Sequence, residues 1–306
     1  MLRVGGPSTA AASWIPEFLA HTKQSGAAVD FVSTHAYGAA DGFITTDGKR
    51  NVKLTPSPDA IIGEVRKTRT QMKEAGYPDM PLYFTEWNAS WSLGDPVLDT
   101  YIMAPYILSN LKGSQGMLQG MSFWTYSDLF EELGPPKRPF GGGFGMMTID
   151  GIRKPAWFAY KYLNQLGDTA LNTVDQQSYA AKDGRNVQVL LWDLVQPENE
   201  SGNRAVYGKV LPTHESAPVK IELKGLKRGS YAISLHRTGF EANDPYTAYL
   251  KMGSPKSLTA EQVQELQSVT QDRPETSNIK VNSSGTATFN VKMRVNDVVL
   301  VKVSPQ

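Results

Sequence analysis

A glutamate that directly follows a short apolar run is the strongest candidate for chemistry in this sequence. Glu86 lies in Leu82-Tyr83-Phe84-Thr85-Glu86-Trp87-Asn88, where an extended strand is expected to end. Polar and aromatic residues also stand beside or after the apolar runs, namely His35, Tyr37, Trp87, Trp124, Asp128, Glu131 and Glu132. Carboxylates accept hydrogen bonds from sugar hydroxyls, and aromatic rings pack on the apolar faces of a pyranose. These residue types therefore predict a saccharide site.

The elements that must position these residues alternate between strand and helix as far as about residue 167. Strands are expected at residues 2–4, 29–34, 81–85 and 120–125. Helical spacing of apolar residues covers 13–23, 59–75, 97–111 and 154–166. This repeat is typical of βα units on a parallel sheet. Because the carboxyl ends of such strands share one mouth, the candidate residues are expected to meet there.

Each candidate residue also has a purely structural interpretation. A glutamate at a strand end can form a structural salt bridge, and a His-x-Tyr pair or Trp124 can belong to a core. Asp128 can cap a helix, and only one of the neighbouring Glu131 and Glu132 can readily face the mouth. The glycine-rich loop at residues 141–145 does not follow a strand or open a helix with Lys-Ser/Thr, so it is not a phosphate loop. We expect it to form a mobile wall or lid. The ordered recurrence of candidates at βα spacing favours the functional interpretation.

Composition narrows the classes of partner. The net charge is +1, and acidic and basic residues form no block of like charge, so neither nucleic acid nor an anionic membrane surface is expected as partner. No apolar run approaches the roughly 18 residues that span a bilayer. The chain has no cysteine, and its four histidines lie far apart, which disfavours a thiolate or histidine-rich metal site. The expected partner is uncharged or small.

The character of the sequence changes after Gly167. Segments rich in Val, Ile, Leu and Tyr, separated by turn residues, occupy 186–193, 217–223, 230–236, 287–293 and 297–303. Their pattern predicts an antiparallel β-sandwich. One helix interrupts it, because Thr259-Ala260-Glu261-Gln262 has the form of a capping box. We therefore expect an α/β domain over residues 1–170 and an all-β accessory domain over residues 171–306.

Several motifs resemble those of glycoside hydrolase family 39, whose best-known members are β-xylosidases. They are Leu2-Arg3-Val4-Gly5-Gly6-Pro7, Asp30-Phe31-Val32-Ser33-Thr34-His35-Ala36-Tyr37, Phe84-Thr85-Glu86-Trp87-Asn88, Phe123-Trp124-Thr125-Tyr126-Ser127-Asp128-Leu129-Phe130-Glu131-Glu132 and Gly142-Gly143-Phe144-Gly145-Met146. The likeness continues through Asn243-Asp244-Pro245-Tyr246 and Met252-Gly253-Ser254-Pro255 in the second part.

This resemblance implies a fold and a set of roles. The fold is a (β/α)8 TIM barrel with a β-sandwich accessory domain. Glu86 corresponds to the nucleophile of the family. The positions that line the sugar pocket correspond to His35, Tyr37, Trp124 and Glu132, and neither a metal nor an organic cofactor is expected.

One departure from the family is large. The general acid/base of the family is the glutamate of an Asn-Glu-Pro motif at the end of the fourth barrel strand, and no Asn-Glu-Pro occurs here. Glu64 and Glu74 lie on a predicted amphipathic helix, where they are expected to be solvated. We therefore expect strands five to eight of the barrel without the acid/base. A half barrel leaves a sheet edge uncovered, so a complementing N-terminal half or a homo-oligomer is expected.

Three functions remain open from the sequence. The first is a retaining β-xylosidase that hydrolyses terminal β-xylosides of xylo-oligosaccharides through a covalent glycosyl-enzyme on Glu86. The second is a catalytically impaired carbohydrate-binding or assembly module. The third is an α-L-iduronidase-like enzyme, for which Lys137, Arg138 and Arg153 would have to face a uronate carboxylate. The sequence gives no indication of the compartment.

Overall fold

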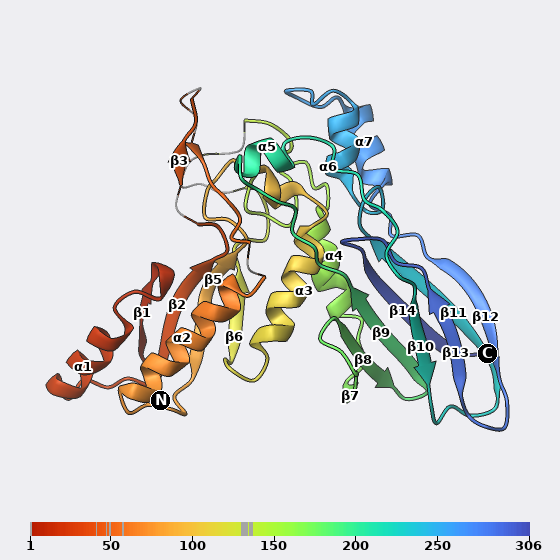
Figure 1. Cartoon of the computed structure of the whole chain (residues 1–306), viewed down its shortest axis with the longest axis horizontal. Coiled ribbons are helices and arrows are strands. Elements are labelled where there is room, and N and C mark those ends of the chain that lie inside the picture. The colour runs from red at the N-terminus through yellow and green to blue at the C-terminus, as the bar shows by residue number, and fades with distance from the viewer. Residues whose placement is uncertain are drawn as a thin grey trace.

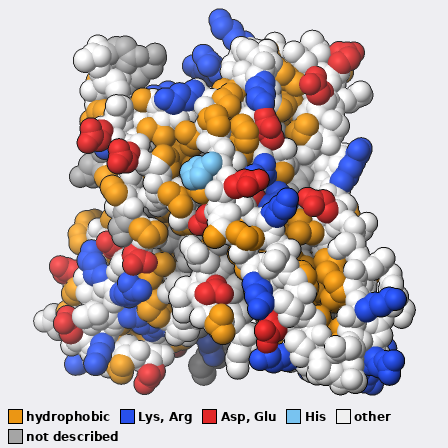
Figure 2. Space-filling view, turned by 45° about the vertical axis from the view of Figure 1, so that its right-hand side comes forward, with side chains coloured by type: hydrophobic (Ala, Val, Ile, Leu, Met, Phe, Trp, Pro, Cys, Tyr) orange, Lys and Arg blue, Asp and Glu red, His pale blue; other side chains and the backbone are white. Residues whose placement is uncertain are grey.

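The computed structural model describes residues 2–40, 42–46, 48, 50–56, 58–129, 134 and 137–306. Figure 1 shows two parts side by side: a parallel sheet with its helices, and a set of antiparallel strands that ends at the C-terminus. None of the helices in the described ranges is both long and apolar enough to cross a membrane. On the face drawn in Figure 2, acidic and basic side chains are interspersed.

Four parallel strands form the first sheet, in the order β1-β2-β5-β6. Their bounds are Gly5–Thr9 for β1, Phe31–Tyr37 for β2, Leu82–Asn88 for β5 and Gly120–Phe123 for β6. The helices that follow them are α1 (Ile15–Ser25), α2 (Ala60–Glu74), α3 (Met103–Ser114) and α4 (Pro155–Leu163). The predicted alternation of strand and helix on a parallel sheet is confirmed. The first strand was expected at residues 2–4, whereas Gly5–Thr9 is the segment that pairs with β2.

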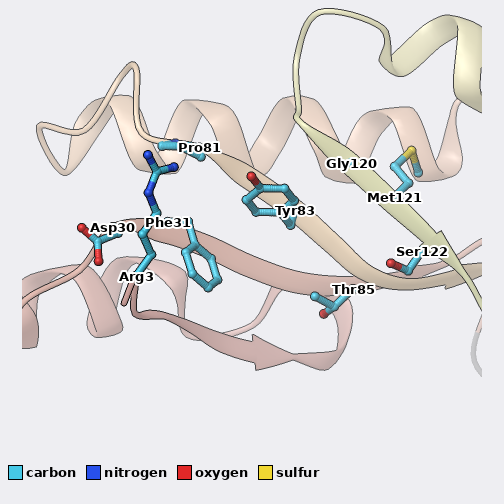
Figure 3. Close-up of a pocket in the computed structure, with 9 residues that line it drawn as sticks. All are labelled: Arg3, Asp30, Phe31, Pro81, Tyr83, Thr85, Gly120, Met121 and Ser122. Carbon is cyan, nitrogen blue, oxygen red and sulfur yellow. The ribbon is translucent and has the colours of Figure 1, made fainter. Parts of the chain in front are cut away.

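The two faces of this sheet differ in burial. Leu82 and Phe84 have no exposed surface and belong to a core shared with α1, α2 and α3. Tyr83 and Thr85 alternate with them and therefore stand on the opposite face. A hollow of about 520 Å³ lies on that second face near the amino ends of the strands, and Figure 3 shows Phe31 and Tyr83 on neighbouring strands within it.

Short elements follow the carboxyl ends of the parallel strands. The two-stranded ribbon of β3 (Phe43–Ile44) and β4 (Arg50–Asn51) follows β2, and the 3-10 helix η2 (Pro96–Asp99) follows β5. A further 3-10 turn, η1 (Ala10–Ala12), comes after β1. In Figure 1, β3 lies at the same end of the molecule as α5, α6 and α7. Residues from distant parts of the sequence therefore gather at one end of the sheet.

A six-stranded antiparallel sheet, ordered β12-β11-β14-β9-β8-β7, makes up most of the second part. The strands are β7 (Thr169–Leu171), β8 (Ser178–Asp183), β9 (Asn186–Trp192), β11 (Gly229–Thr238), β12 (Glu275–Val281) and β14 (Val298–Pro305). A second sheet pairs β10 (Val219–Leu223) with β13 (Ala287–Val291). The expected boundary between residues 170 and 171 falls inside β7, whose residues pair with β8.

Alternation along β9 and β14 gives the six-stranded sheet two apolar faces. Leu190 and Leu300 face the core that contains α3 and α4, whereas Val189 and Val301 face the core shared with β10 and β13. The sheet is therefore packed on both sides, which fixes it against the helices of the first part. Three further helices lie between the strands of this second part: α5 (Asn203–Tyr207), α6 (Pro245–Lys251) and α7 (Ala260–Ser268). The predicted capping box of Thr259 and Gln262 is confirmed.

Candidate active site

An irregularity in the pairing of β2 with β5 determines where Glu86 points. Thr34 pairs with Phe84, but the next residue, His35, pairs with Glu86, so β5 contains one extra residue at this place. A bulge of this kind reverses the alternation of side chains beyond it. Glu86 thus stands beside His35 on the face that also holds Tyr83, away from the helices. Alternation without the bulge would have directed Glu86 toward the helical core.

Two side chains of β2 hold one oxygen of Glu86. The Tyr37 hydroxyl donates a hydrogen bond of 2.8 Å to Oε2, and Nδ1 of His35 lies 3.3 Å from the same oxygen. Oε1 has no hydrogen-bond partner among the described residues. The Glu86 side chain keeps 25% of its surface exposed, and that of His35 keeps 18%. The carboxylate is therefore oriented through Oε2, and its side chain is partly exposed.

Asn88 connects this strand end to the loop after β6. Its side chain is fully buried, and Nδ2 donates to the carbonyl oxygens of Trp124 and Phe144. The Trp124 N–H in turn donates to the Trp87 carbonyl at 3.0 Å. Trp124 is half-buried beside these contacts, and the peptide bond that follows it is cis. The structure thus brings Trp124 to the same strand ends as Glu86, His35 and Tyr37.

A buried group of three charges fixes the glycine-rich loop. Nζ of Lys154 lies 2.6 Å from Asp99 Oδ1 and 2.8 Å from Asp128 Oδ2, and the three side chains have at most 1% of their surface exposed. The carboxylates also accept from loop N–H groups, Asp99 from Gly142 at 2.7 Å and Asp128 from Gly145 at 2.8 Å. Buried, ion-paired carboxylates therefore hold the loop by its backbone, whereas a mobile wall or lid was expected.

Burial and mutual charge shift the pKa values within this group. Burial raises the pKa of Asp99 to about 6, and the charge of Asp128 adds to the effect while Lys154 opposes it. Burial alone would lower the pKa of Lys154, but the charges of Asp128 and Asp99 outweigh it and raise that pKa. The raised pKa favours the charged form of Lys154, and this charge in turn favours the ionised form of Asp99.

Two of the expected substrate-binding residues need correction. Asp128 is 1% exposed and is engaged by Lys154 and the Gly145 N–H, so its carboxylate is not available to a ligand. Trp87 has no exposed surface, and its ring packs edge-to-face on Phe123 at 5.6 Å within the helical core. The bulge that directs Glu86 outward leaves the next residue on the core side. Glu131 and Glu132 lie outside the described residues.

Three residues that support the site were not predicted from the sequence. They are Asn88, Asp99 and Lys154, all fully buried. The amide of Asn88 stands two positions after Glu86, and this proximity could have indicated a supporting role from the sequence. The pairing of Lys154 with Asp99 and Asp128 could not be predicted from the sequence, because it joins three segments far apart in the chain. Within the described ranges, no three His, Asp or Glu side chains are grouped in a way that could hold a metal ion.

A parallel α/β sheet whose carboxyl edge carries an oriented acid among aromatic side chains is the arrangement of a glycoside hydrolase. Comparison with known proteins gives the family. The sequence profile of glycosyl hydrolases family 39 matches residues 1–288, and the chain belongs to this family.

Individual relatives agree with this assignment. The chain is 30% identical to a β-xylosidase of Caldicellulosiruptor saccharolyticus over 303 residues, which are 99% of this chain and 59% of that protein. Its structure is similar to that of a family 39 enzyme from Xanthomonas axonopodis pv. citri, with a TM-score of 0.96 and 48% identity, over 100% of this chain and 60% of the other. A monomeric β-xylosidase from Caulobacter crescentus CB15 gives a TM-score of 0.95 and 49% identity, over 99% and 62%. The chain spans about three fifths of the length of these relatives.

Proposed function

We propose that the chain carries the nucleophile of a retaining β-xylosidase, and that this nucleophile is Glu86. One observation carries the proposal: Tyr37 and His35 hold Oε2 of Glu86, while Oε1 has no partner among the described residues and the side chain is partly exposed. A nucleophilic carboxylate needs this combination, because one oxygen must stay fixed while the other forms a bond to carbon.

The reaction follows from these positions. Oε1 of Glu86 attacks the anomeric carbon of a terminal xyloside, and the bond from that carbon to the leaving oxygen breaks. The leaving oxygen takes a proton from a second carboxylic acid, which in retaining enzymes lies about 5–5.5 Å from the nucleophile. Water then attacks the glycosyl-enzyme, gives its proton to that second group and releases Glu86 as a carboxylate.

The second carboxyl group is proposed to come from outside these 306 residues. The sequence holds no Asn-Glu-Pro, the motif that carries the acid/base in the resemblance described above. Asp128, which follows β6 at the same edge of the sheet, is committed to Lys154. A polypeptide segment that pairs with the free edges of the parallel sheet, either covalently joined or separate, would bring the missing group opposite Glu86.

His35, Tyr37 and Trp124 are proposed to contact the sugar. All three are partly exposed at the strand ends around Glu86. Imidazole and phenol groups can hydrogen-bond xylose hydroxyls, and an indole can cover the apolar face of the ring. The xylosidase assignment is supported by the β-xylosidases among the relatives. Glu132 stays a prediction for the same pocket.

The test is covalent labelling of Glu86. The chain is incubated with a 2-deoxy-2-fluoro-xyloside that has a good leaving group, and its intact mass is measured before the labelled peptide is sequenced by mass spectrometry. One adduct per chain on the peptide that contains Glu86 is expected. Glu86→Gln should give none, whereas Asp128→Asn keeps the nucleophile and should still label. An unlabelled wild-type chain, or a label elsewhere, contradicts the assignment.

A sugar-binding or assembly module is the second candidate, and the open face of the parallel sheet favours it. Phe31 and Tyr83 are only partly buried on that face, and Thr85 and Ser122 are exposed there. A module of this kind binds xylo-oligosaccharides equally well after Glu86→Gln and forms no adduct with any leaving group. Binding measurements on this variant, together with the labelling test, separate the two candidates.

A further inference from the structure

A groove of about 680 Å³ lies at the end of the molecule where the loops gather. Its walls come from the loops after β2, β5 and β6, from α5 and from α6. This volume lies within the usual range of small-ligand sites, about 300–1,000 Å³. The proposed mechanism does not use this groove, and two arginines, Arg138 and Arg204, are part of its lining.

Arg204 is held in place at one end of its guanidinium group. Its Nε donates to the Arg50 carbonyl at 2.8 Å, and its backbone N–H donates to Asn51 Oδ1 at 3.2 Å. Its terminal NH2 group lies 3.6 Å from the position that a Cβ on Gly94 would occupy, so the guanidinium extends over the loop after β5. Within the described part of the chain, no hydrogen bond engages its terminal N–H groups.

Arg138 is exposed and lines the groove near an aromatic wall. The wall consists of Phe140, Tyr246 and Tyr249, with ring centroids 5.0 Å apart for Phe140 and Tyr249 and 5.8 Å for Phe140 and Tyr246. The charge of Arg138 opposes the effect of burial, which raises the pKa of Tyr249. The Tyr249 ring is held in place by its hydroxyl, which donates to the Pro255 carbonyl at 2.9 Å.

Neither groove arginine forms an ion pair with any residue that the structure describes. Arginine ion pairs in the described part of the chain involve Arg66, Arg237 and Arg294, and none involves Arg138 or Arg204. Asp95 is the acid whose charge interacts with Arg204, and it is 3% exposed and bonded to Asn203 at 2.6 Å. Two exposed guanidinium groups therefore face the groove, and guanidinium pairs well with carboxylates.

The glycine-rich loop connects this groove to the catalytic strand end. Gly141 and Gly142 line the groove, and the Gly142 carbonyl accepts from the Gly94 N–H at 2.9 Å. Two residues further along, the Phe144 carbonyl accepts from Asn88, which follows Glu86 by two positions on β5. The same loop therefore contacts both the groove and the strand that carries Glu86.

From this geometry we infer that the groove binds a carboxylate-bearing sugar that branches from the oligosaccharide whose terminal residue is held at Glu86. The inference rests on the proposed function and adds to it a preference for acidic, uronate-branched substrates over neutral ones. Arg204 and Arg138 bind the carboxylate, and Phe140, Tyr246 and Tyr249 form the apolar part of the lining. In this arrangement the uronate is a side branch of the oligosaccharide. The terminal sugar that Glu86 attacks is neutral.

The test compares two ligands that differ only in the acidic branch. Calorimetry measures the binding of xylotriose and of xylotriose with one glucuronic acid branch to the full chain bearing Glu86→Gln, which prevents turnover. The branched ligand is expected to bind tighter by roughly tenfold or more, because charged hydrogen bonds are the strong ones. This preference should shrink as salt rises, since the arginines are exposed. Arg138→Gln and Arg204→Gln should each remove most of it, and Arg204→Lys should restore part.

Arg153→Gln is the matched control. Arg153 is also an exposed arginine, but its guanidinium lies 5.7 Å from the Trp157 ring centroid, and it does not line the groove. Its removal should leave the preference unchanged. Equal affinity for the two ligands overturns the inference, as does a preference that survives both groove substitutions or tighter binding of inorganic phosphate than of the branched sugar. Failure of the Glu86→Gln chain to bind plain xylotriose would instead count against the proposed function.

Discussion

The hydroxyl of Tyr37 and the carboxylate of Glu86 meet across two neighbouring parallel strands, with Tyr37 Oη 2.8 Å from Oε2. The contact exists because the extra residue in β5 brings Glu86 onto the same face as His35 and Tyr37. The contact fixes the carboxylate through Oε2. The proposed nucleophile is therefore oriented by the sheet itself, through residues on a second strand.

Tyr37→Phe should slow the labelling of Glu86 without unfolding the chain. The substitution removes a hydrogen bond to a charged group, worth about 1.5–3 kcal/mol, which corresponds to roughly a ten- to hundredfold lower rate. The measurement is the rate of adduct formation with the fluoro-xyloside. Tyr83→Phe is the control, since Tyr83 shares this face but packs edge-to-face on Phe31. Equal rates for wild type and Tyr37→Phe would show that this contact does not position the nucleophile.

Apolar runs predicted the strands that matter most for the site. Residues 29–34 and 81–85 were expected as strands, and β2 and β5 extend three residues further at their carboxyl ends. The strand at Gly5–Thr9 was misplaced because it lacks an apolar run. Its contacts with β2 include a 2.7 Å hydrogen bond between the hydroxyls of Ser8 and Ser33. Local hydrophobicity cannot reveal an edge strand of this kind.

The errors in the site have a common origin in packing. Glu86 and Trp87 are adjacent in the sequence, and only the bulge decides which of them faces outward. Asp128 looked like a ligand because it follows a strand, yet Lys154, 26 residues away, engages it. Register and long-range ion pairs are properties of the folded chain. The residue types at the strand ends were readable from the sequence, but their side-chain directions were not.

Lys154→Met should destabilise the chain strongly. It leaves Asp99 and Asp128 buried without a cation, and breaking a buried ion pair from one side commonly costs about 3–5 kcal/mol. Urea unfolding followed by tryptophan fluorescence measures the loss. Lys67→Met, which removes an exposed pair with Glu64 at 3.3 Å, should change stability by at most about 0.5 kcal/mol.

The double variant Lys154→Met/Asp128→Asn tests the electrostatic origin of that loss. Neutralising one of the two carboxylates should recover part of the stability, because less buried charge remains uncompensated. If the double variant is no more stable than Lys154→Met alone, lost packing of the lysine side chain is the cause instead.

Asp244→Asn should stabilise the chain near neutral pH. Burial raises the pKa of Asp244 from its ordinary 3.8 to about 6, although hydrogen bonds from Thr247 and the Glu241 N–H lower it. The folded state therefore binds more protons than the unfolded state between these values, and stability falls as pH rises from about 4 to about 6. The effect is of the order of 3 kcal/mol. Asparagine keeps the acceptor that caps α6 at the Thr247 N–H.

The measurement is the free energy of unfolding from pH 4 to pH 8 for wild type and Asp244→Asn. The difference between the two should grow through pH 6 and then level off. Asp99, with its pKa also raised to about 6, acts in the same window, so the variant should retain some dependence. Parallel curves for the two proteins would mean that Asp244 does not titrate in this range.

Gly142→Ala should be more damaging than Gly151→Ala, although both glycines have φ of +70°. A Cβ on Gly142 would lie 2.5 Å from the Asp95 backbone nitrogen, whereas one on Gly151 meets nothing within 4 Å. Gly151→Ala isolates the cost of the left-handed backbone, about 1–2 kcal/mol. Gly142→Ala adds displacement of the loop, so it should be less stable and should also weaken binding in the arginine groove. Equal unfolding free energies would rule out the steric contribution.

The chain by itself should glycosylate Glu86 only from substrates with good leaving groups. General acid assistance is worth about 10²–10⁴ in rate, and the proposed source of that acid lies outside these residues. A dinitrophenyl xyloside needs little protonation, so it should give a burst of one phenolate per chain, whereas an alkyl xyloside should give no measurable product. Glu86→Gln should abolish the burst. Addition of the segment of a family 39 relative that lies outside the region matched by this chain should raise the alkyl rate selectively, because only that substrate depends on the acid. Comparable rates for both leaving groups in the unsupplemented chain would place a working acid within these 306 residues.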